Sequence, residues 1–479
     1  MKYAGIRSIA VNAVYLLGAH GVTAVARAAY AVMLARMLGP VPYGYYGYAM
    51  SWSLTFLPFT MVAMDAILSR EIGRAGGNAE ARIAQILGFR ALATILAAVA
   101  CTLAGLVTEE QPQLRQLLIV FSIALFGRSM AICTNSIFTA FERSRYAFRQ
   151  ETIFRALEVG LGLAILLLGG GLLFVAILHA VMWWAQALHG LVLIRRDFVP
   201  VKFRLDWSST GALLKMGALL VIANIFGNWL TQGPIVLYRN ANGDAFVLGQ
   251  LALAMQAFYI LQGVPLGIGG ASLPVLSRAV DRPDRKDELF VSVMLRVGLM
   301  FGAAAGLGGM GAGPWFIESV FGTGYTQAGV LLGPSLFILA PFTCALATSY
   351  VLVARGHVAA NALSALLGAV AMSALANLLH DRFGTSGVIL SAIIGNSVWA
   401  AASVAFTARD VRLNASLSLL RPSLCVAAGL LAFYQLEPAS GSWLAMAAGL
   451  TALFGMAAVV GVLSPSDRAA IAAVVRNRR

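Results

Sequence analysis

The sequence has few charged residues. Asp, Glu, Lys and Arg make up 11% of its 479 residues, whereas a soluble globular chain contains about 25%. Hydrophobic residues account for 59% of the chain, and the mean hydropathy is +0.82. This balance excludes an ordinary soluble globular protein and predicts a polytopic membrane protein.

Cysteines and catalytic motifs are also scarce. The four cysteines fall inside apolar segments, with no CxxC or metal-ligand spacing. The sequence contains no Walker loop, GxSxG or HExxH motif, and its five histidines are scattered. We therefore expect no enzyme activity, no cofactor and no metal site. The cysteines are Cys101, Cys133, Cys344 and Cys425.

Acidic residues are the rarer charged type, with 20 Asp and Glu against 34 Lys and Arg. The resulting net charge of +14 does not indicate a nucleic-acid partner, because the basic residues lie mainly at the ends of apolar segments. Membrane topology and anionic lipid headgroups explain this pattern better.

Long apolar segments define the fold class. A segment of about 20 apolar residues spans a bilayer as a helix, and on this basis the sequence predicts an all-α protein with about 14 transmembrane helices. If the N-terminus lies inside, the great majority of the Lys and Arg residues fall on the inner side. We therefore expect both termini to be cytoplasmic.

A short motif recurs in the two halves of the chain. The pattern LSRxxxR at Leu68–Arg74 returns at Leu276–Arg282, roughly 210 residues later. An even number of spans in each half predicts two parallel six-helix lobes, followed by two further helices. The predicted N-lobe covers residues 1–206, the C-lobe covers 207–408, and the last two helices with a cytoplasmic tail cover 409–479.

The first predicted helix carries Arg27 well inside an apolar run. Burying this cation costs at least about 2.5–3.5 kcal/mol on insertion scales, so it indicates a cavity or a structural ion pair. His20, Thr23 and Tyr30 share its helix face. A cavity lined by Arg favours anions, and phosphate in particular, because the guanidinium fork matches phosphate oxygens.

Arg128, in the fourth predicted span, is the second intramembrane cation. It shares a helix face with Asn135 and Thr139. Arg128 is a candidate for ligand binding, with neutralisation by Glu142 or Glu158 as the alternative.

Amide side chains line one face of the seventh predicted span. Asn224, Asn228 and Gln232 follow one another at intervals of four residues. They predict either a cavity lining or hydrogen bonds between helices. Arg239 follows near the outer end of the same span.

Two acidic residues in the spans are candidates for coupling transport to protons. Asp65 lies near Arg70, and Glu158 lies three residues after Arg155, so a local ion pair explains each of them equally well. His20 is a third coupling candidate.

Four segments resemble one family. Leu34–Gly44 resembles the "ARLLGPEEYG" turn after the first helix of bacterial Wzx-type polysaccharide flippases, although Pro42 replaces a frequent acidic residue. These flippases belong to the oligosaccharidyl-lipid exporter (MOP) superfamily, which also holds MATE exporters and MurJ-type lipid II flippases. The other three segments are Met64–Glu71, in which Ala66-Ile67 departs from the common Leu-Gly, Val320–Tyr325 ("FGxxY") and Arg382–Gly387 ("RYGxxGA").

The resemblance implies a flippase for an undecaprenyl-pyrophosphate-linked oligosaccharide in the bacterial cytoplasmic membrane, working by alternating access through a cationic cavity. The repeat unit would belong to O-antigen, capsule or exopolysaccharide. The implied partners are this lipid-linked substrate, membrane lipids, and the polysaccharide polymerase and glycosyltransferases. In this scheme Arg27 and Arg128 hold phosphate, the three amides of the seventh span contact sugar, and Arg239 assists release.

Three alternatives remain open at this point. A MurJ-type lipid II flippase would also have a cationic cavity. A MATE-type exporter of cations or drugs would be expected to carry membrane-embedded acids where this chain has His20 and Arg27. A non-transporting membrane scaffold would have no reason to bury Arg27.

Overall fold

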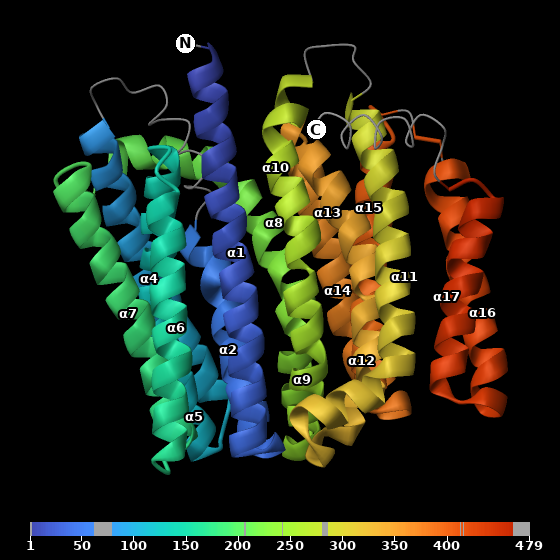
Figure 1. The fold of residues 1–479 in the computed structure, drawn as a ribbon. Coiled ribbons are helices and arrows are strands. Elements are labelled where there is room, and N and C mark those ends of the chain that lie inside the picture. Colours follow the sequence, from blue (N-terminus) through green and yellow to red (C-terminus); the bar gives the residue numbers. More distant parts are fainter. Residues whose placement is uncertain are drawn as a thin grey trace. The chain divides into compact units, whose positions relative to one another are not determined.

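The protein is almost entirely helical (Figure 1). The computed structural model describes residues 2–61, 79–205, 207–241, 243–279, 286–411, 413–414 and 416–462, and no strand occurs among them. The helices of the first half are α1 (Lys2–Leu38), α2 (Pro40–Met61), α4 (Ala79–Thr108), α5 (Pro112–Ala140), α6 (Arg145–Leu167), α7 (Leu172–Asp197) and α8 (Trp207–Asn240). The others are α9 (Ala245–Leu261), α10 (Gly263–Ala279), α11 (Lys286–Phe321), α12 (Thr326–Phe337), α13 (Leu339–Ala354), α14 (Val358–Phe383), α15 (Thr385–Thr407), α16 (Arg421–Ser440) and α17 (Ser442–Val459), with short helical turns at Thr323–Tyr325 and Ser416–Leu420.

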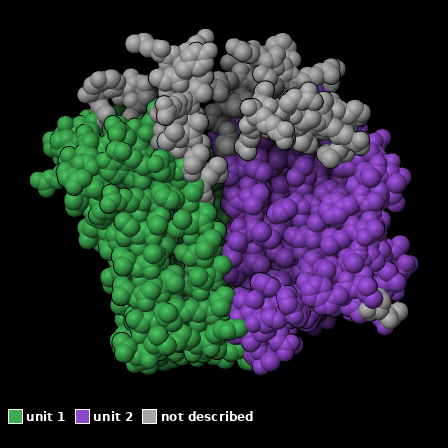
Figure 2. Space-filling model, viewed as in Figure 1, with its two compact units in different colours: residues 1–252 green, residues 253–479 purple. Residues whose placement is uncertain are grey.

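The chain divides into two compact units, residues 1–252 and 253–479 (Figure 2). In the first unit α5 packs against α4 and α7, α1 packs along α6, and α2 packs against α8. In the second unit α11 packs against α12, α13 and α17, and α14 packs against α15. This division by contacts groups α8 with the first unit, whereas the predicted repeat assigns it to the second lobe; the lobe boundaries stay a prediction.

Twelve segments in the described part of the chain are long and apolar enough to cross a membrane. Two further helices lie where the sequence predicts spans. α2 is rich in Gly, Pro and Tyr, and α6 carries five charged side chains in its first fourteen residues. Counted with these two, the helices agree with the predicted all-α fold of about 14 membrane helices. The protein is therefore a multi-pass membrane protein.

Two glycines permit sharp turning and close packing in the first unit. Gly39, with a φ of 79°, lies between α1 and α2, and its N–H donates a hydrogen bond of 3.1 Å to the carbonyl of Ala35. This left-handed residue ends α1, and Pro40 then begins α2. On α5, a Cβ added to Gly127 would lie 2.7 Å from the backbone nitrogen of Trp184 on α7. The absence of a side chain at Gly127 lets these two helices approach closely.

Several predicted features lie outside the described residues. These are Asp65, the first repeat motif at residues 68–74, and the C-terminal tail after residue 462. The second repeat motif is described only to Ala279, and the side chain of His20 is also outside the description.

Candidate functional site: a buried polar network in the first unit

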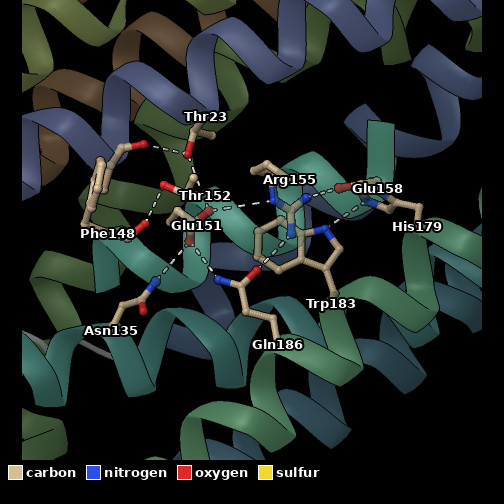
Figure 3. A network of polar contacts seen from close by, with 11 residues as sticks. Thr23, Asn135, Phe148, Glu151, Thr152, Arg155, Glu158, His179, Trp183 and Gln186 are labelled. Carbon is tan, nitrogen blue, oxygen red and sulfur yellow. Dashed lines mark hydrogen bonds and ion pairs between the residues drawn. The ribbon is translucent and has the colours of Figure 1, made fainter. Parts of the chain in front are cut away.

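The charged residues of α6 form one helix face directed into the first unit. Glu151, Arg155 and Glu158 follow one another at intervals of four and three residues, which places them on the same side of a helix. Arg155 and Glu158 are buried, with exposed fractions of 7% and 5%. Buried charges in a membrane protein require partners, and neighbouring helices supply them (Figure 3).

Arg155 and Glu158 form the centre of this network. Their side chains make an ion pair, and Arg155 Nη2 also donates a hydrogen bond of 2.9 Å to Oε1 of Gln186 on α7. The second oxygen of Glu158, Oε1, lies 2.5 Å from Nδ1 of His179, also on α7. The ion pair between Arg155 and Glu158, one of the two possibilities in the sequence, is therefore present.

The tautomer of His179 follows from its two hydrogen bonds. The indole Nε1–H of Trp183 donates to His179 Nε2 over 3.1 Å, so Nε2 must act as an acceptor. The ring proton then lies on Nδ1, which donates to Glu158. This arrangement fits a neutral imidazole beside an ionised carboxylate.

Glu151 connects α6 to three other helices. Its Oε1 accepts hydrogen bonds from Nε2 of Gln186 at 2.8 Å and from Nδ2 of Asn135 on α5 at 3.0 Å. Its Oε2 lies 3.4 Å from Oγ1 of Thr23 on α1 and 3.7 Å from Nε of Arg155. Thr23 and Asn135, which the sequence places on polar helix faces, thus meet at this carboxylate (Figure 3).

Arg128 has a different environment. It lies near the middle of the 29-residue helix α5, and its guanidinium carbon is 4.9 Å from the ring centroid of Trp183. Its Nη1 contacts the sulfur of Met50 at 3.8 Å, and its Nε is buried without a hydrogen-bond partner. Among the described residues, no carboxylate forms an ion pair with Arg128, so neither Glu142 nor Glu158 neutralises it directly.

Three guanidinium groups lie near one another in this part of the first unit. Arg27 on α1 is half-buried, and both it and Arg155 are close enough to Arg128 to interact with it electrostatically. Arg128 has no carboxylate partner among the described residues, so its surroundings are suited to an anion.

Tyr30, the remaining predicted residue of the α1 face, is also directed toward this region. Its side chain is buried, and its ring lies 6.2 Å from that of Tyr46 on α2. The ring also packs against Gly162 on α6, where an added Cβ would collide with it. The predicted polar face of α1 is therefore the face that packs along α6.

The amides of α8 are not gathered into one cluster. Asn224 is exposed, whereas Asn228 donates a hydrogen bond of 2.7 Å from Nδ2 to the backbone carbonyl of Leu54 on α2. Gln232 is buried, and its Oε1 has no hydrogen-bond partner. Asn228 thus links two helices, and Gln232 offers an unused acceptor inside the unit.

Arg239, at the end of α8, is held by an acidic residue. Its Nε and Nη2 donate to the two carboxylate oxygens of Glu109 at 3.0 and 2.8 Å, and Gln111 lies 3.4 Å away. Burial raises the pKa of the Glu109 carboxyl, but the hydrogen bonds and charge of Arg239 outweigh burial, so this pKa lies below its ordinary value. The pair ties α8 to the loop between α4 and α5 in the first unit.

We expect the Glu109–Arg239 pair to stabilise the protein at neutral pH and to fail in acid. Because the folded-state pKa of Glu109 is depressed, the contribution is complete above its unfolded pKa of about 4.3 and is lost as the pH falls through the lower folded value. Glu109→Gln should therefore lower the thermal unfolding temperature more at pH 7 than at about pH 3.5, because the contribution declines progressively below about pH 4.3. Glu110→Gln is the control, because Glu110 is exposed. An equal effect of Glu109→Gln at both pH values would contradict this assignment.

Four members of the network are not candidates in the sequence: Glu151, His179, Trp183 and Gln186. They lie on α6 and α7, and the contacts between these two helices join residues more than twenty positions apart. The sequence signal that could have revealed these residues is the number of charged side chains in α6, which is high for a helix between two apolar helices. Within the described residues, no group of His, Cys, Asp and Glu has an arrangement that would hold a metal ion.

A many-helix membrane protein with a charged site buried among its helices has the architecture of a membrane transporter. The family model described as "polysaccharide biosynthesis protein" matches residues 9–280, which is more than half of the chain. The chain belongs to the polysaccharide biosynthesis protein family, and the resemblance in its sequence motifs is confirmed.

Solved structures share the fold. The lipid II flippase MurJ in an inward closed conformation has a TM-score of 0.69 and 13% sequence identity, with 94% of this chain and 98% of that chain covered. The eukaryotic MATE transporter AtDTX14 has a TM-score of 0.59 and 14% identity, covering 84% and 95%. A MOP superfamily transporter from Pyrococcus furiosus has a TM-score of 0.55 and 16% identity, covering 85% and 96%. No curated protein matches the sequence.

Proposed function

We propose that the protein is a flippase that moves an undecaprenyl-pyrophosphate-linked oligosaccharide across the bacterial cytoplasmic membrane by alternating access. Membership of the polysaccharide biosynthesis family supports the class of substrate, and the fold shared with a flippase and with transporters supports movement across a membrane. The substrate would be a repeat unit of O-antigen, capsule or exopolysaccharide, supplied by glycosyltransferases and used by a polymerase. Both termini would be cytoplasmic.

Arg128 is the observation that carries this proposal. A guanidinium near the middle of a membrane helix is costly unless it meets an anion. Arg128 is without a carboxylate partner among the described residues and has a free Nε, whereas Arg155 in the same network is paired. A phosphate that accepts hydrogen bonds from Arg128 would supply the missing charge. Arg27 would contribute a second positive charge on the side of α1.

The amides of α8 would bind the sugar. Asn224 is exposed and Gln232 has an unused acceptor, so both can bond hydroxyl groups, whereas Asn228 would have to share its amide with Leu54. Arg239 would assist release only after leaving Glu109. Of the coupling candidates, Glu158 lies in the network beside Arg155.

Purified protein in vesicles tests the proposal. A fluorescent prenyl-diphosphate-linked disaccharide is placed in both leaflets, and an impermeant quencher reports how much of it reaches the outer leaflet. We expect protein-dependent loss of the protected fraction for this probe. A lipid II probe and a lipophilic cation serve as comparisons. Transport of lipid II alone would favour the MurJ-type alternative, and transport of the cation alone would favour the MATE-type alternative.

A further inference from the structure

Trp183 on α7 contacts two arginines of the network, the ion-paired Arg155 and Arg128, which has no carboxylate partner among the described residues. The guanidinium carbon of Arg155 lies 4.1 Å from its ring centroid, and that of Arg128 lies 4.9 Å away. The tryptophan is 7% exposed. Two cations over one desolvated ring are each attracted by its π electrons, so the ring holds both guanidinium groups in place.

The other end of the indole determines the state of the neighbouring histidine. The Nε1–H of Trp183 donates a hydrogen bond to Nε2 of His179, and His179 Nδ1 then donates to Glu158 (Figure 3). Arg155 takes the second oxygen of the same carboxylate. Both oxygens of Glu158 are thereby engaged, and the carboxylate is kept from pairing with Arg128.

We propose that Trp183 is the positioning residue of the phosphate site: its ring holds Arg128 ready for an anion, and its N–H keeps Glu158 committed to Arg155. The two arginines have the same chemistry but different partners, and this one side chain contacts both. Arg155 is a structural cation, and Arg128 is the cation left for the ligand. This inference rests on the proposed phosphate-lipid function.

The charged and titratable groups around His179 come from every helix packed against it. α6 contributes Glu158 and Arg155, and α5 contributes Arg128. The ring of Tyr46 on α2 lies 6.2 Å from that of His179. One carboxylate, two guanidinium groups and a phenol thus surround the imidazole. Among the described residues, only Glu158 is placed to stabilise a second proton on His179, and taking it up requires loss of the bond from Trp183.

Two substitutions separate the ring from the N–H. Trp183→Phe keeps an aromatic face but removes the donor, and Trp183→Leu removes both. The measurement is the binding of fluorescent farnesyl diphosphate to the full-length protein in nanodiscs of neutral lipid. At pH 8 we expect Trp183→Leu to weaken binding about tenfold, because the surface that holds Arg128 is lost. Trp183→Phe should retain binding within about threefold of the unchanged protein.

The pH profile distinguishes positioning from a loss of packing. In Trp183→Phe the His179 Nε2 has no donor, so a second proton on the imidazole no longer costs a hydrogen bond, and protonation becomes easier as the pH falls. The added positive charge strengthens binding of the anionic probe. The ratio of the variant's affinity to that of the unchanged protein should therefore rise between pH 8 and pH 5.5; taking the ratio cancels the probe's own ionisation. His179→Asn in the same background keeps a donor for Glu158 but cannot titrate, and it should abolish this rise.

The outcomes separate this inference from the proposed function. If the unchanged protein does not bind the probe, or if Arg128→Ala binds it equally well, the phosphate-site function fails. If Arg128→Ala loses binding while Trp183→Leu keeps it, the function stands and the positioning role is wrong. A flat pH ratio for Trp183→Phe also overturns the role of the N–H. Should Trp183→Leu fail to fold, this pH ratio remains the deciding measurement.

Discussion

Arg128→Ala should abolish transport while the protein remains folded in the membrane. If Arg128 binds the phosphate of the ligand, truncation removes a charge-assisted hydrogen bond in a desolvated site, which costs about 2–5 kcal/mol, or roughly thirty-fold to several thousand-fold in affinity. The side chain makes no ion pair with any described carboxylate, so its removal leaves no buried anion behind. We expect loss of surface polysaccharide in a host that lacks its own flippase, with normal amounts of protein in the membrane.

Two matched substitutions sharpen this result. Arg128→Lys keeps the charge but loses the planar fork and the stacking on Trp183, so it should restore transport only partly. Arg149→Ala removes an exposed arginine from α6 and should leave transport unchanged. Normal polysaccharide from Arg128→Ala, at normal expression, would show that this arginine does not contact the substrate.

The fold follows from features that lie close together in the sequence. Apolar runs of membrane length locate the helices, and the glycine-proline pair at Gly39-Pro40 marks the turn between α1 and α2. The candidate cations Arg27 and Arg128 are visible for the same reason, because a charge inside an apolar run stands out without any knowledge of its neighbours. Helical periodicity also places Thr23 on the face that meets the network.

The partners of these residues require the tertiary structure. Nothing local indicates that Glu151 accepts hydrogen bonds from Asn135 and Gln186, since these three side chains lie on different helices. His179 and Trp183 look like ordinary residues of an apolar helix until α6 places Glu158 and Arg155 beside them. The sequence therefore reveals where charge is buried, and the packing of helices decides which charges neutralise one another.

Glu158→Ala should destabilise the protein more than any other single change in the network. Glu158 is 5% exposed and is the common partner of Arg155 and His179. Its removal leaves Arg155 with one ion pair among the described residues, the longer 3.7 Å contact to Glu151, and leaves the His179 donor unsatisfied. Breaking a buried ion pair from one side costs about 3–5 kcal/mol. The free energy of unfolding, measured by titration with a denaturing detergent, should fall by that amount, and Glu437→Ala, at an exposed position on α16, should change it little.

A double substitution distinguishes a broken charge pair from a cavity. If the cost comes from the uncompensated charge of Arg155, then Glu158→Leu combined with Arg155→Leu should be more stable than Glu158→Leu alone, because two apolar side chains can replace a buried ion pair at little cost. Recovery should be incomplete, since Gln186 and His179 each still lack the partner they have in the intact network. Arg128 is untouched by these changes, so a stable double variant should still bind a phosphate lipid. If the double variant is no more stable than Glu158→Leu, the cost of losing Glu158 comes from packing and not from the uncompensated charge of Arg155.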